Sequence, residues 1–354
     1  MQQYKQEWFG NIRGDILAGI VVCLALFPEV IGFMIVAGVP PIVGVYATFF
    51  ITAIAAFFGS SKGMISAAAG SVALVLAHLV AEYGIQYLFA ATILAGILQV
   101  ALGSLKVGTL MRYIPKPVMT GFVNGLGIMM FTSQLDHFQG SLLLPLLGLL
   151  GIAIIFLFPR ITKKIPAPIV AILVITGIVL GFGLDVKTLG DMGSISTDLP
   201  RFGIPAVPMT VETLRIIFPT ALSVAIVGLV ESLLTAQLVD EITEEKSDKN
   251  QETLSQGLGN VVSGFFGGIA GCGMIGQTII NLNYGGLGRL ATFLSGFFML
   301  LSVVLLNGSV VQIPVVALAA VMVVVSIETI NWDSIKRLRT NPKNESFAMI
   351  LTVA

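Results

Sequence analysis

Two short segments rich in glycine and alanine interrupt long apolar stretches and could bind an anion through their backbone. They are Ser66-Ala-Ala-Ala-Gly-Ser71 and Gly267-Gly-Ile-Ala-Gly-Cys-Gly-Met-Ile-Gly-Gln-Thr278. Each predicts a helix that begins part-way through a membrane. The first N–H groups of such a helix lack intrahelical partners and carry partial positive charge, so they attract an anion without lysine or arginine. One break in each half of the chain is typical of inverted-repeat secondary transporters.

The residue types inside the two breaks indicate the candidate anion-binding groups. In the first break, small side chains leave backbone amides accessible to a ligand, and the hydroxyls of Ser66 and Ser71 could add donors. In the second break, glycines frame the start of the helix and polar side chains follow it. Close helix packing is the alternative reason for small residues, but two breaks in antiparallel helices favour a ligand site. The predicted anion-binding residues here are Ala69, Gly70, Ser71, Gly276 and Gln277.

Two acidic residues lie inside predicted membrane spans. Glu231 lies in the apolar stretch 224–238, and Thr235 follows one helical turn later on the same face. An ionised carboxylate there is costly unless it is paired, protonated or bound to a cation. We therefore predict a coupling site for Na⁺ or H⁺ at Glu231 and Thr235, with a structural hydrogen-bonding acid as the alternative. Glu29 follows Pro28, which opens the first span by removing a backbone hydrogen bond, so Glu29 either lines the anion site or braces the opened helix.

Several other residues are expected to be structural. Asp15 and Arg13 lie at the membrane edge and predict an interfacial pair. Cys23 and Cys272 lie in apolar segments and are interpreted as small packing residues. The charged run from 240 to 250 predicts a solvated cytoplasmic loop.

Composition indicates a membrane protein. The 354 residues are 56% hydrophobic and 11% charged, with a formal net charge of zero, whereas soluble domains carry about 25% charged residues. The zero net charge argues against a nucleic-acid partner. The sequence contains no Walker A motif, no cluster of metal ligands, and none of the common hydrolase motifs that would predict an enzyme. No cofactor is expected, apart from Na⁺ as a candidate coupling ion.

The apolar stretches predict a multi-pass topology in two halves. A span needs about 20 apolar residues, and fewer in a half-helix buried in protein. By this measure the chain has two sets of spans, which a polar connector at 185–213 separates. The chain ends in Phe347-Ala-Met-Ile-Leu-Thr-Val-Ala354, which is interpreted as the truncated start of a thirteenth span. The earlier spans are expected near 15–36, 41–58, 65–82, 87–105, 115–133, 142–158, 166–184, 214–238, 253–268, 272–284, 288–306 and 309–328.

The distribution of basic residues supports this topology. With the N-terminus in the cytoplasm and a change of side at every segment, only Lys187, Arg201 and Arg215 of the 19 Lys and Arg residues fall outside. Such a bias toward the inside is expected for correctly oriented membrane helices. It also gives the two halves opposite orientations, as in an inverted repeat. Short loops favour a bacterial inner membrane.

Particular motifs resemble those of the SulP (sulfate permease) family of anion transporters. They are Phe27-Pro-Glu-Val-Ile-Gly-Phe33, Ala37-Gly-Val-Pro-Pro-Ile-Val-Gly-Val-Tyr46, Ile114-Pro-Lys-Pro-Val-Met-Thr-Gly-Phe122, Ile165-Pro-Ala-Pro168, Gly190-Asp-Met-Gly-Ser-Ile195, Val230-Glu-Ser-Leu-Leu-Thr235 and the segment from Gly257 to Arg289. The resemblance implies an all-α fold of two inverted repeats of seven helices, with half-helices as helices 3 and 10. The repeats would be 1–184 and 214–354, joined by an extracellular connector at 185–213. Helices 1–4 and 8–11 would form a core, and helices 5–7 and 12 onward a gate, in an elevator-like transporter.

The resemblance also assigns roles and shows departures. In sodium-coupled bicarbonate relatives, an acid and a threonine in helix 8 bind sodium, and Glu231 and Thr235 match them. The residues that open helix 10 in those relatives match Gly273, Met274 and Ile275, so the resemblance adds Gly273 to the cation site and Met274 and Ile275 to the anion site. Relatives often have hydroxyl residues where this chain has Ala69 and Ile275, and a basic residue where it has Gln277. Most relatives carry a cytoplasmic STAS domain after the last helix, which this sequence is expected to lack, and relatives are commonly homodimers.

These features together predict a secondary transporter of a small inorganic anion, bicarbonate or sulfate, coupled to Na⁺ or H⁺. A channel-like or exchange conductor of chloride or dicarboxylates is the first alternative. A nucleobase:cation symporter of the same architecture is the second, because such proteins use paired intramembrane glutamates, as Glu29 and Glu231 could be. The anion, the direction and the oligomeric state stay open.

Overall fold

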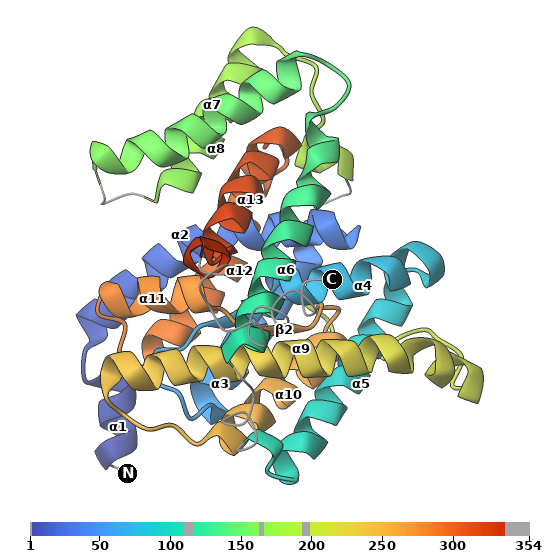
Figure 1. The fold of residues 1–354 in the computed structure, drawn as a ribbon, viewed down its shortest axis with the longest axis vertical. Helices are drawn as coiled ribbons and strands as arrows, with labels where there is room; N and C mark the ends of the chain where they lie inside the picture. The colour runs from blue at the N-terminus through green and yellow to red at the C-terminus, as the bar shows by residue number, and fades with distance from the viewer. Residues whose placement is uncertain (1, 109–115, 163–165, 193–198, 337–354) are drawn as a thin grey trace. The chain divides into compact units, whose positions relative to one another are not determined.

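The described chain is almost entirely helical (Figure 1). The computed structural model describes residues 2–108, 116–162, 166–192 and 199–336. The predicted thirteenth span and parts of the motifs at 114–122, 165–168 and 190–195 lie outside these residues. Five described helices are long and apolar enough to cross a membrane, and four shorter apolar helices accompany them.

The helices follow the predicted spans closely. The main differences are that α9 is longer at both ends than its predicted span 214–238, and that two short strands precede α4 and α11. The helices are α1 (Gln2–Phe9), α2 (Ile12–Ala37), α3 (Pro41–Phe58), α4 (Gly70–Tyr83), α5 (Ile85–Ser104), α6 (Lys116–Gln134), α7 (Leu143–Leu157), α8 (Ala167–Phe182), α9 (Val211–Thr243), α10 (Lys249–Phe265), α11 (Ile275–Asn283), α12 (Arg289–Val310), α13 (Val315–Thr329) and α14 (Trp332–Lys336). The strands are β1 (Ser66–Ala68) and β2 (Gly271–Gly273), and the 3-10 turns are η2 (Leu135–Phe138), η3 (Phe158–Arg160) and η4 (Leu189–Met192).

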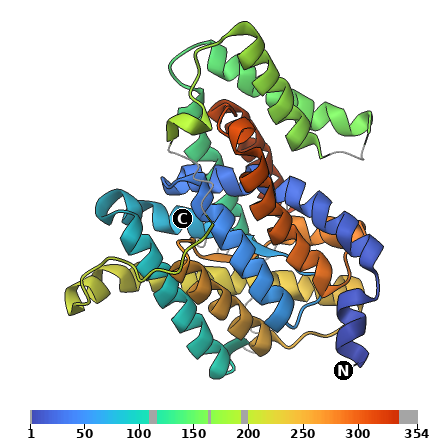
Figure 2. The same cartoon turned by 180° about the vertical axis from the view of Figure 1, so that it is seen from behind.

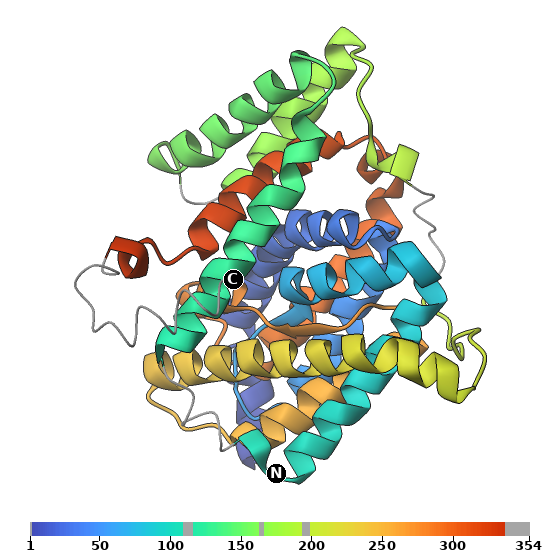
Figure 3. The ribbon, with the colours of Figure 1, turned by 45° about the vertical axis from the view of Figure 1, so that its right-hand side comes forward.

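The chain divides into two compact units, each built from two separate stretches of sequence. Unit 1 comprises Met1–Thr109 and Leu189–Gln312, and unit 2 comprises Leu110–Thr188 and Ile313–Ala354. In unit 1, α9 runs past β2, and α2, α3 and α12 pack together, as the view from behind shows (Figures 1 and 2). In unit 2, α13 packs against α6, α7 and α8, and its contact with α6 is visible in Figure 3. The predicted division into core, gate and inverted repeats stays a prediction.

The ends of α2 and α3 show how local sequence sets the helix boundaries. The side chain of Asn11 accepts a hydrogen bond from the Gly14 N–H at the start of α2. Gly38 ends α2 in the left-handed region with φ 70°, where glycine carries no steric penalty. Pro41 then begins α3 at a position where its missing N–H costs no helical hydrogen bond.

The predicted pair of Asp15 and Arg13 is wrong. Asp15 is fully buried in the first turn of α2 and accepts a hydrogen bond from the Gly288 N–H at 3.1 Å. Arg13 is exposed, and no ion pair joins it to Asp15 among the described residues. The loop that precedes α12 covers Asp15, and this long-range contact leaves no mark in the local sequence.

Glycines allow α5 and α10 to approach closely. A Cβ at Gly96 would lie 2.6 Å from both the Gly257 oxygen and the Val261 nitrogen, and a Cβ at Gly257 would lie 2.7 Å from the Gly96 oxygen. Real Cβ atoms do not approach backbone this closely, so both positions need glycine. This contact brings polar residues of α10 near the two breaks.

Gly96→Ala is expected to destabilise unit 1. The added methyl group would meet backbone atoms of α10, and these cannot move without displacing the helix. The substitution should therefore lower the free energy of unfolding by about 1–3 kcal/mol. Denaturant unfolding of the purified protein in detergent measures this change. The matched control is Gly177→Ala in α8, where an added Cβ meets nothing within 4 Å. Equal stability of the two variants would contradict the role of the glycine contact.

The two breaks pair with each other as a small antiparallel sheet. Ser66 lies opposite Gly273, Ala67 opposite Cys272, and Ala68 opposite Gly271. Helices predicted to begin at 65 and 272 therefore begin at Gly70 and Ile275, because the preceding residues are extended. Because β1 leads into α4 and β2 leads into α11, their pairing holds the starts of the two helices together.

Candidate functional site

Both half-helices begin without a side-chain cap. Ala69 precedes α4 in extended conformation, Met274 precedes α11 likewise, and neither provides a side-chain hydrogen bond to the helix that follows. The Met274 N–H donates to the Ile65 oxygen at 2.8 Å, so the second break is bonded to the first up to the residue where α11 starts. The next N–H groups in each helix are those that a helix leaves without internal partners. Such groups are suited to bind an anion.

The start of α11 is the more accessible of the two helix ends. Gly276 is exposed, and a Cβ added there would meet nothing within 4 Å. Ile275 is half-buried, whereas Ala69 and Ser71 of the first break are 2% and 3% exposed. Open space therefore lies beside the first turn of α11.

Glu231 joins α9 to both breaks. The Ser71 hydroxyl of α4 donates to Glu231 Oε2 at 2.5 Å, and the Cys272 thiol of β2 donates to the same oxygen at 3.1 Å. Both donors are neutral groups, and no ion pair to Glu231 is present among the described residues. The predicted cation-coupling acid thus lies where the two breaks meet.

Thr235 and Gly273 lie beside Glu231, as predicted. The Thr235 hydroxyl donates to the Glu231 carbonyl at 2.8 Å and to the Gly273 carbonyl at 3.1 Å. The Gly273 N–H donates to the Ser232 hydroxyl at 2.9 Å. Ser232 and Thr235, about one helical turn apart on α9, therefore bind the N–H and the carbonyl of Gly273 in β2. The cation-binding role of these residues stays a prediction.

Two residues of this cluster were missed as functional candidates. Cys272 was interpreted as a packing residue, but its thiol contacts Glu231 and lies 3.8 Å from the Ser71 hydroxyl. Ser232 directly follows Glu231 in the sequence, and this adjacency was the available signal. The contact of Cys272 with Glu231 joins residues 41 positions apart, which local sequence does not reveal.

Glu29 lies against the first turn of α11. The Gln277 side-chain amide donates a short hydrogen bond to Glu29 Oε2, and Gln277 itself is 4% exposed. Glu29 is half-buried. The structure therefore brings Glu29 to the second break, beside the accessible Gly276.

Other polar residues of the breaks support the backbone. Ser66 is buried and accepts a hydrogen bond from Gln256 at 2.6 Å, so its hydroxyl does not lie at a helix N-terminus as expected. The Thr278 hydroxyl accepts from the Ile65 N–H at 3.0 Å. Asn281 donates to the carbonyls of Gly63 and Gly286. These side chains stabilise the bends and leave the backbone amides of α4 and α11 as the candidate ligands.

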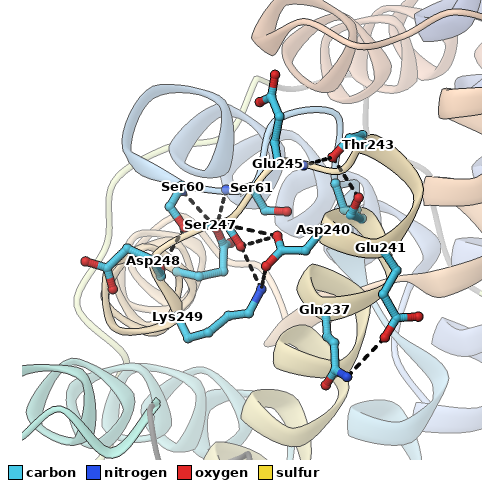
Figure 4. A network of polar contacts seen from close by, with 12 residues as sticks. Ser60, Ser61, Gln237, Asp240, Glu241, Thr243, Glu245, Ser247, Asp248 and Lys249 are labelled. Atoms are coloured by element: carbon cyan, nitrogen blue, oxygen red, sulfur yellow. Dashed lines mark hydrogen bonds and ion pairs between the residues drawn. The ribbon is translucent and has the colours of Figure 1, made fainter.

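The charged run from 240 to 250, which starts in the last turn of α9 and ends in the first turn of α10, forms a separate cluster (Figure 4). Asp240 accepts hydrogen bonds from Ser247 and from Lys249 Nζ at 2.7 Å, and the Asp240 and Lys249 side chains are only 19% and 21% exposed. Lys62 pairs with Glu245 at 2.5 Å. Most of the run is exposed, as predicted for a solvated loop, whereas Asp240 and Lys249 are largely shielded and belong to α9 and α10. A cavity of about 400 Å³ lies beside them, but no residue of either break lines it.

Sequence comparison identifies the relatives of this chain. The family model described as "Sulfate permease family" matches residues 12–144 and 141–352. "Putative sulfate transporter YbaR" of Bacillus subtilis (strain 168) is 55% identical over 352 residues, which cover 99% of this chain and 73% of that protein. "Bicarbonate transporter BicA" of Picosynechococcus is 29% identical over 372 residues, which cover 95% of this chain and 65% of that protein.

Solved structures of membrane transport proteins have a similar fold. The transmembrane domain of a cyanobacterial bicarbonate transporter, BicA, matches with a TM-score of 0.90 and 25% identity, covering 98% of this chain and 95% of that domain. A structure of SLC26A9 matches with a TM-score of 0.84 at 19% identity, and shares the fold.

These matches confirm the predicted class of fold, a multi-pass helical membrane protein compatible with two sets of seven helices. They also confirm that the chain is of a transporter class and not an enzyme class, since family members transport anions across membranes. The chain belongs to the sulfate permease family.

Proposed function

We propose that this chain is a secondary transporter that binds a small inorganic anion at the start of α11, with the start of α4 contributing from the other break. The observation that carries the proposal is the meeting of two uncapped half-helices, joined by β1 and β2, at the intramembrane acid Glu231. Helix N-termini favour negative charge through their free N–H groups and their dipoles. The names of its relatives as sulfate and bicarbonate transporters support the same class of substrate.

Coupling to Na⁺ or H⁺ at Glu231 is the second part of the proposal. Its hydrogen-bond partners Ser71 and Cys272 are neutral, so neither compensates a carboxylate charge inside a membrane. A bound cation or proton would compensate it. The Thr235 hydroxyl and the Gly273 carbonyl lie next to it and offer oxygen atoms to a cation. Binding the cation and the anion on neighbouring elements would make each favour the other.

Charge at the site favours a monovalent anion. Each half-helix supplies about half an elementary charge, while Gln277 replaces the basic residue common in relatives and donates to the acid Glu29. A divalent anion would therefore need a cation at Glu231 to bind well. This argument supports bicarbonate as the substrate, or sulfate only when its entry is coupled.

The transport cycle is proposed to use the two units as moving parts. Unit 1 holds both breaks and Glu231, so it would be the core that carries the anion, and unit 2 would be the gate. The proposal also includes an elevator-like motion and two inverted repeats at 1–184 and 214–354. We further propose that the protein is a homodimer in a bacterial inner membrane, with its N-terminus in the cytoplasm. The chain spans 65–73% of the length of the YbaR and BicA relatives, so the activity of a longer protein is part of the same proposal.

Uptake by reconstituted protein tests this function. The measurement is entry of radiolabelled bicarbonate and sulfate into vesicles, with and without an inward Na⁺ gradient, at fixed alkaline pH. Saturable uptake of one anion stimulated by Na⁺ would support sodium coupling at Glu231. Uptake stimulated only by external acid would support proton coupling. Currents without saturation would favour the channel-like alternative, and failure with both anions would direct the test to chloride and dicarboxylates.

A further inference from the structure

One face of α10 carries four buried polar side chains that bind the segments around both breaks. Glu252, Gln256, Asn260 and Ser263 are each at most 1% exposed. Their spacing of four, four and three residues places them in a row along the helix. The row contacts the chain before β1, β1 itself, β2, and the chain before β2.

Asn260 binds both backbone groups of Gly271, the first residue of β2. The Gly271 N–H donates to Asn260 Oδ1 at 2.8 Å, and Asn260 Nδ2 donates to the Gly271 carbonyl at 3.1 Å. These are the two hydrogen bonds that a neighbouring strand would otherwise provide. The side chain of Asn260 thus completes the sheet on the edge of β2 that faces α10.

Gln99 orients the Asn260 side chain. Its Oε1 accepts from Asn260 Nδ2 at 2.8 Å, and its Nε2 donates to the Ala225 carbonyl of α9 at 3.3 Å. Because Nδ2 donates to two acceptors, the Asn260 amide has one orientation that satisfies all its bonds. The pair therefore ties α5, α9 and α10 to β2.

The position of β2 determines the geometry of the whole candidate site. Cys272, which follows Gly271, donates to Glu231, and Gly273 binds Ser232 and Thr235. Met274 then begins α11. A β2 strand three residues long has few bonds of its own, so loss of its edge contact would displace the Glu231 cluster and the first N–H groups of α11 together.

We propose that Asn260 is a positioning residue, held in place by Gln99, that sets the location of β2 and thereby the anion-binding start of α11. It acts through Gly271 and is not itself a ligand of the anion. The inference rests on the proposed function in one respect, since it takes the start of α11 as the anion site.

Alkylation of the two cysteines tests the positioning role directly. The chain contains only Cys23 and Cys272, which are 3% and 0% exposed. In the full chain, Asn260→Ala should increase the rate of N-ethylmaleimide labelling at Cys272 by about tenfold or more, as expected for loss of a buried hydrogen-bond pair, and leave Cys23 unchanged. Peptide mass spectrometry separates the two sites. Cys23 lies in α2 and bonds to Ser302, far in sequence from β2, and so reports general unfolding.

The control variant is Asn124→Ala in unit 2. Asn124 is 2% exposed and also binds through both side-chain atoms, to Ser334 and to the Asn331 N–H, so its loss is comparable in chemistry. It should leave the labelling of Cys272 unchanged. Gln99→Ala, which keeps both bonds to Gly271 possible, should give an effect between those of wild type and Asn260→Ala. Equal acceleration at both cysteines, or none at Cys272, would overturn the proposal.

Transport kinetics provide the second readout. Asn260→Ala should raise the KM for the transported anion by about tenfold, with kcat changed far less, because the binding groups move while the gate does not. A loss of kcat at constant KM would overturn the positioning role. If the wild-type chain transports no anion, the proposed function fails, whereas the labelling experiment still decides the role of Asn260.

Discussion

Glu231→Gln is expected to abolish the cation dependence of anion uptake while the protein stays folded. Glutamine keeps a side-chain oxygen that accepts the hydrogen bond from Ser71, which lies 2.5 Å from the carboxylate. It removes the negative charge that a cation or proton would neutralise. The ratio of uptake with and without the cation gradient should fall to about one, because a cation that no longer binds cannot shift the transport equilibrium. Vesicle uptake under matched gradients measures this ratio.

The control for charge removal is Glu82→Gln, at the other end of α4. Glu82 is exposed and its carboxylate lies 3.6 Å from His78, so its substitution should not change cation dependence. A second variant, Thr235→Val, distinguishes coupling to Na⁺ from coupling to H⁺. If Na⁺ binds the Thr235 oxygen, the Na⁺ concentration for half-maximal stimulation should rise, whereas a proton on Glu231 needs no such ligand. Full cation dependence in Glu231→Gln would refute the coupling role.

The sequence predicts those parts of the site that lie within one element. Glu231 and Thr235 are one helical turn apart, so their shared face follows from helix geometry. The two breaks stand out because small residues interrupt apolar runs, and the structure has half-helices at both. Short-range pattern was enough to locate the helices because a membrane span needs a long apolar stretch, whereas the arrangement in two repeats of seven came from the family resemblance.

The contacts that assemble the site could not be predicted in the same way. β1 and β2 are each three residues long, too short for an alternating pattern, and they pair across about 200 positions of the chain. The Asn260 contact with Gly271 and the Cys272 contact with Glu231 likewise depend on how distant elements pack. Asp15 shows the same limit, since a loop 273 positions away covers it.

Gly276→Leu is expected to eliminate anion binding without destabilising the protein. A Cβ at Gly276 meets nothing within 4 Å, so the structure has room for a side chain. In a helix the Cα–Cβ bond tilts toward the N-terminus, so leucine would cover the first N–H groups of α11 with an apolar group. Replacing glycine inside a helix also raises helix propensity by up to about 1 kcal/mol. Uptake should fall by at least about tenfold, because the N–H groups that bind the anion become inaccessible.

The comparison that makes this result interpretable is Gly177→Leu in α8. Gly177 is also exposed in a helix, and a Cβ there likewise meets nothing within 4 Å, so the substitution has the same size and the same local freedom. Both variants should unfold at or above the wild-type denaturant midpoint, and only Gly276→Leu should lose transport. If Gly276→Leu transports normally, the start of α11 does not bind the anion. If both variants lose transport, apolar bulk on an exposed helix face impairs the cycle by another route. Only selective loss at Gly276 therefore links the exposed helix N-terminus to anion binding.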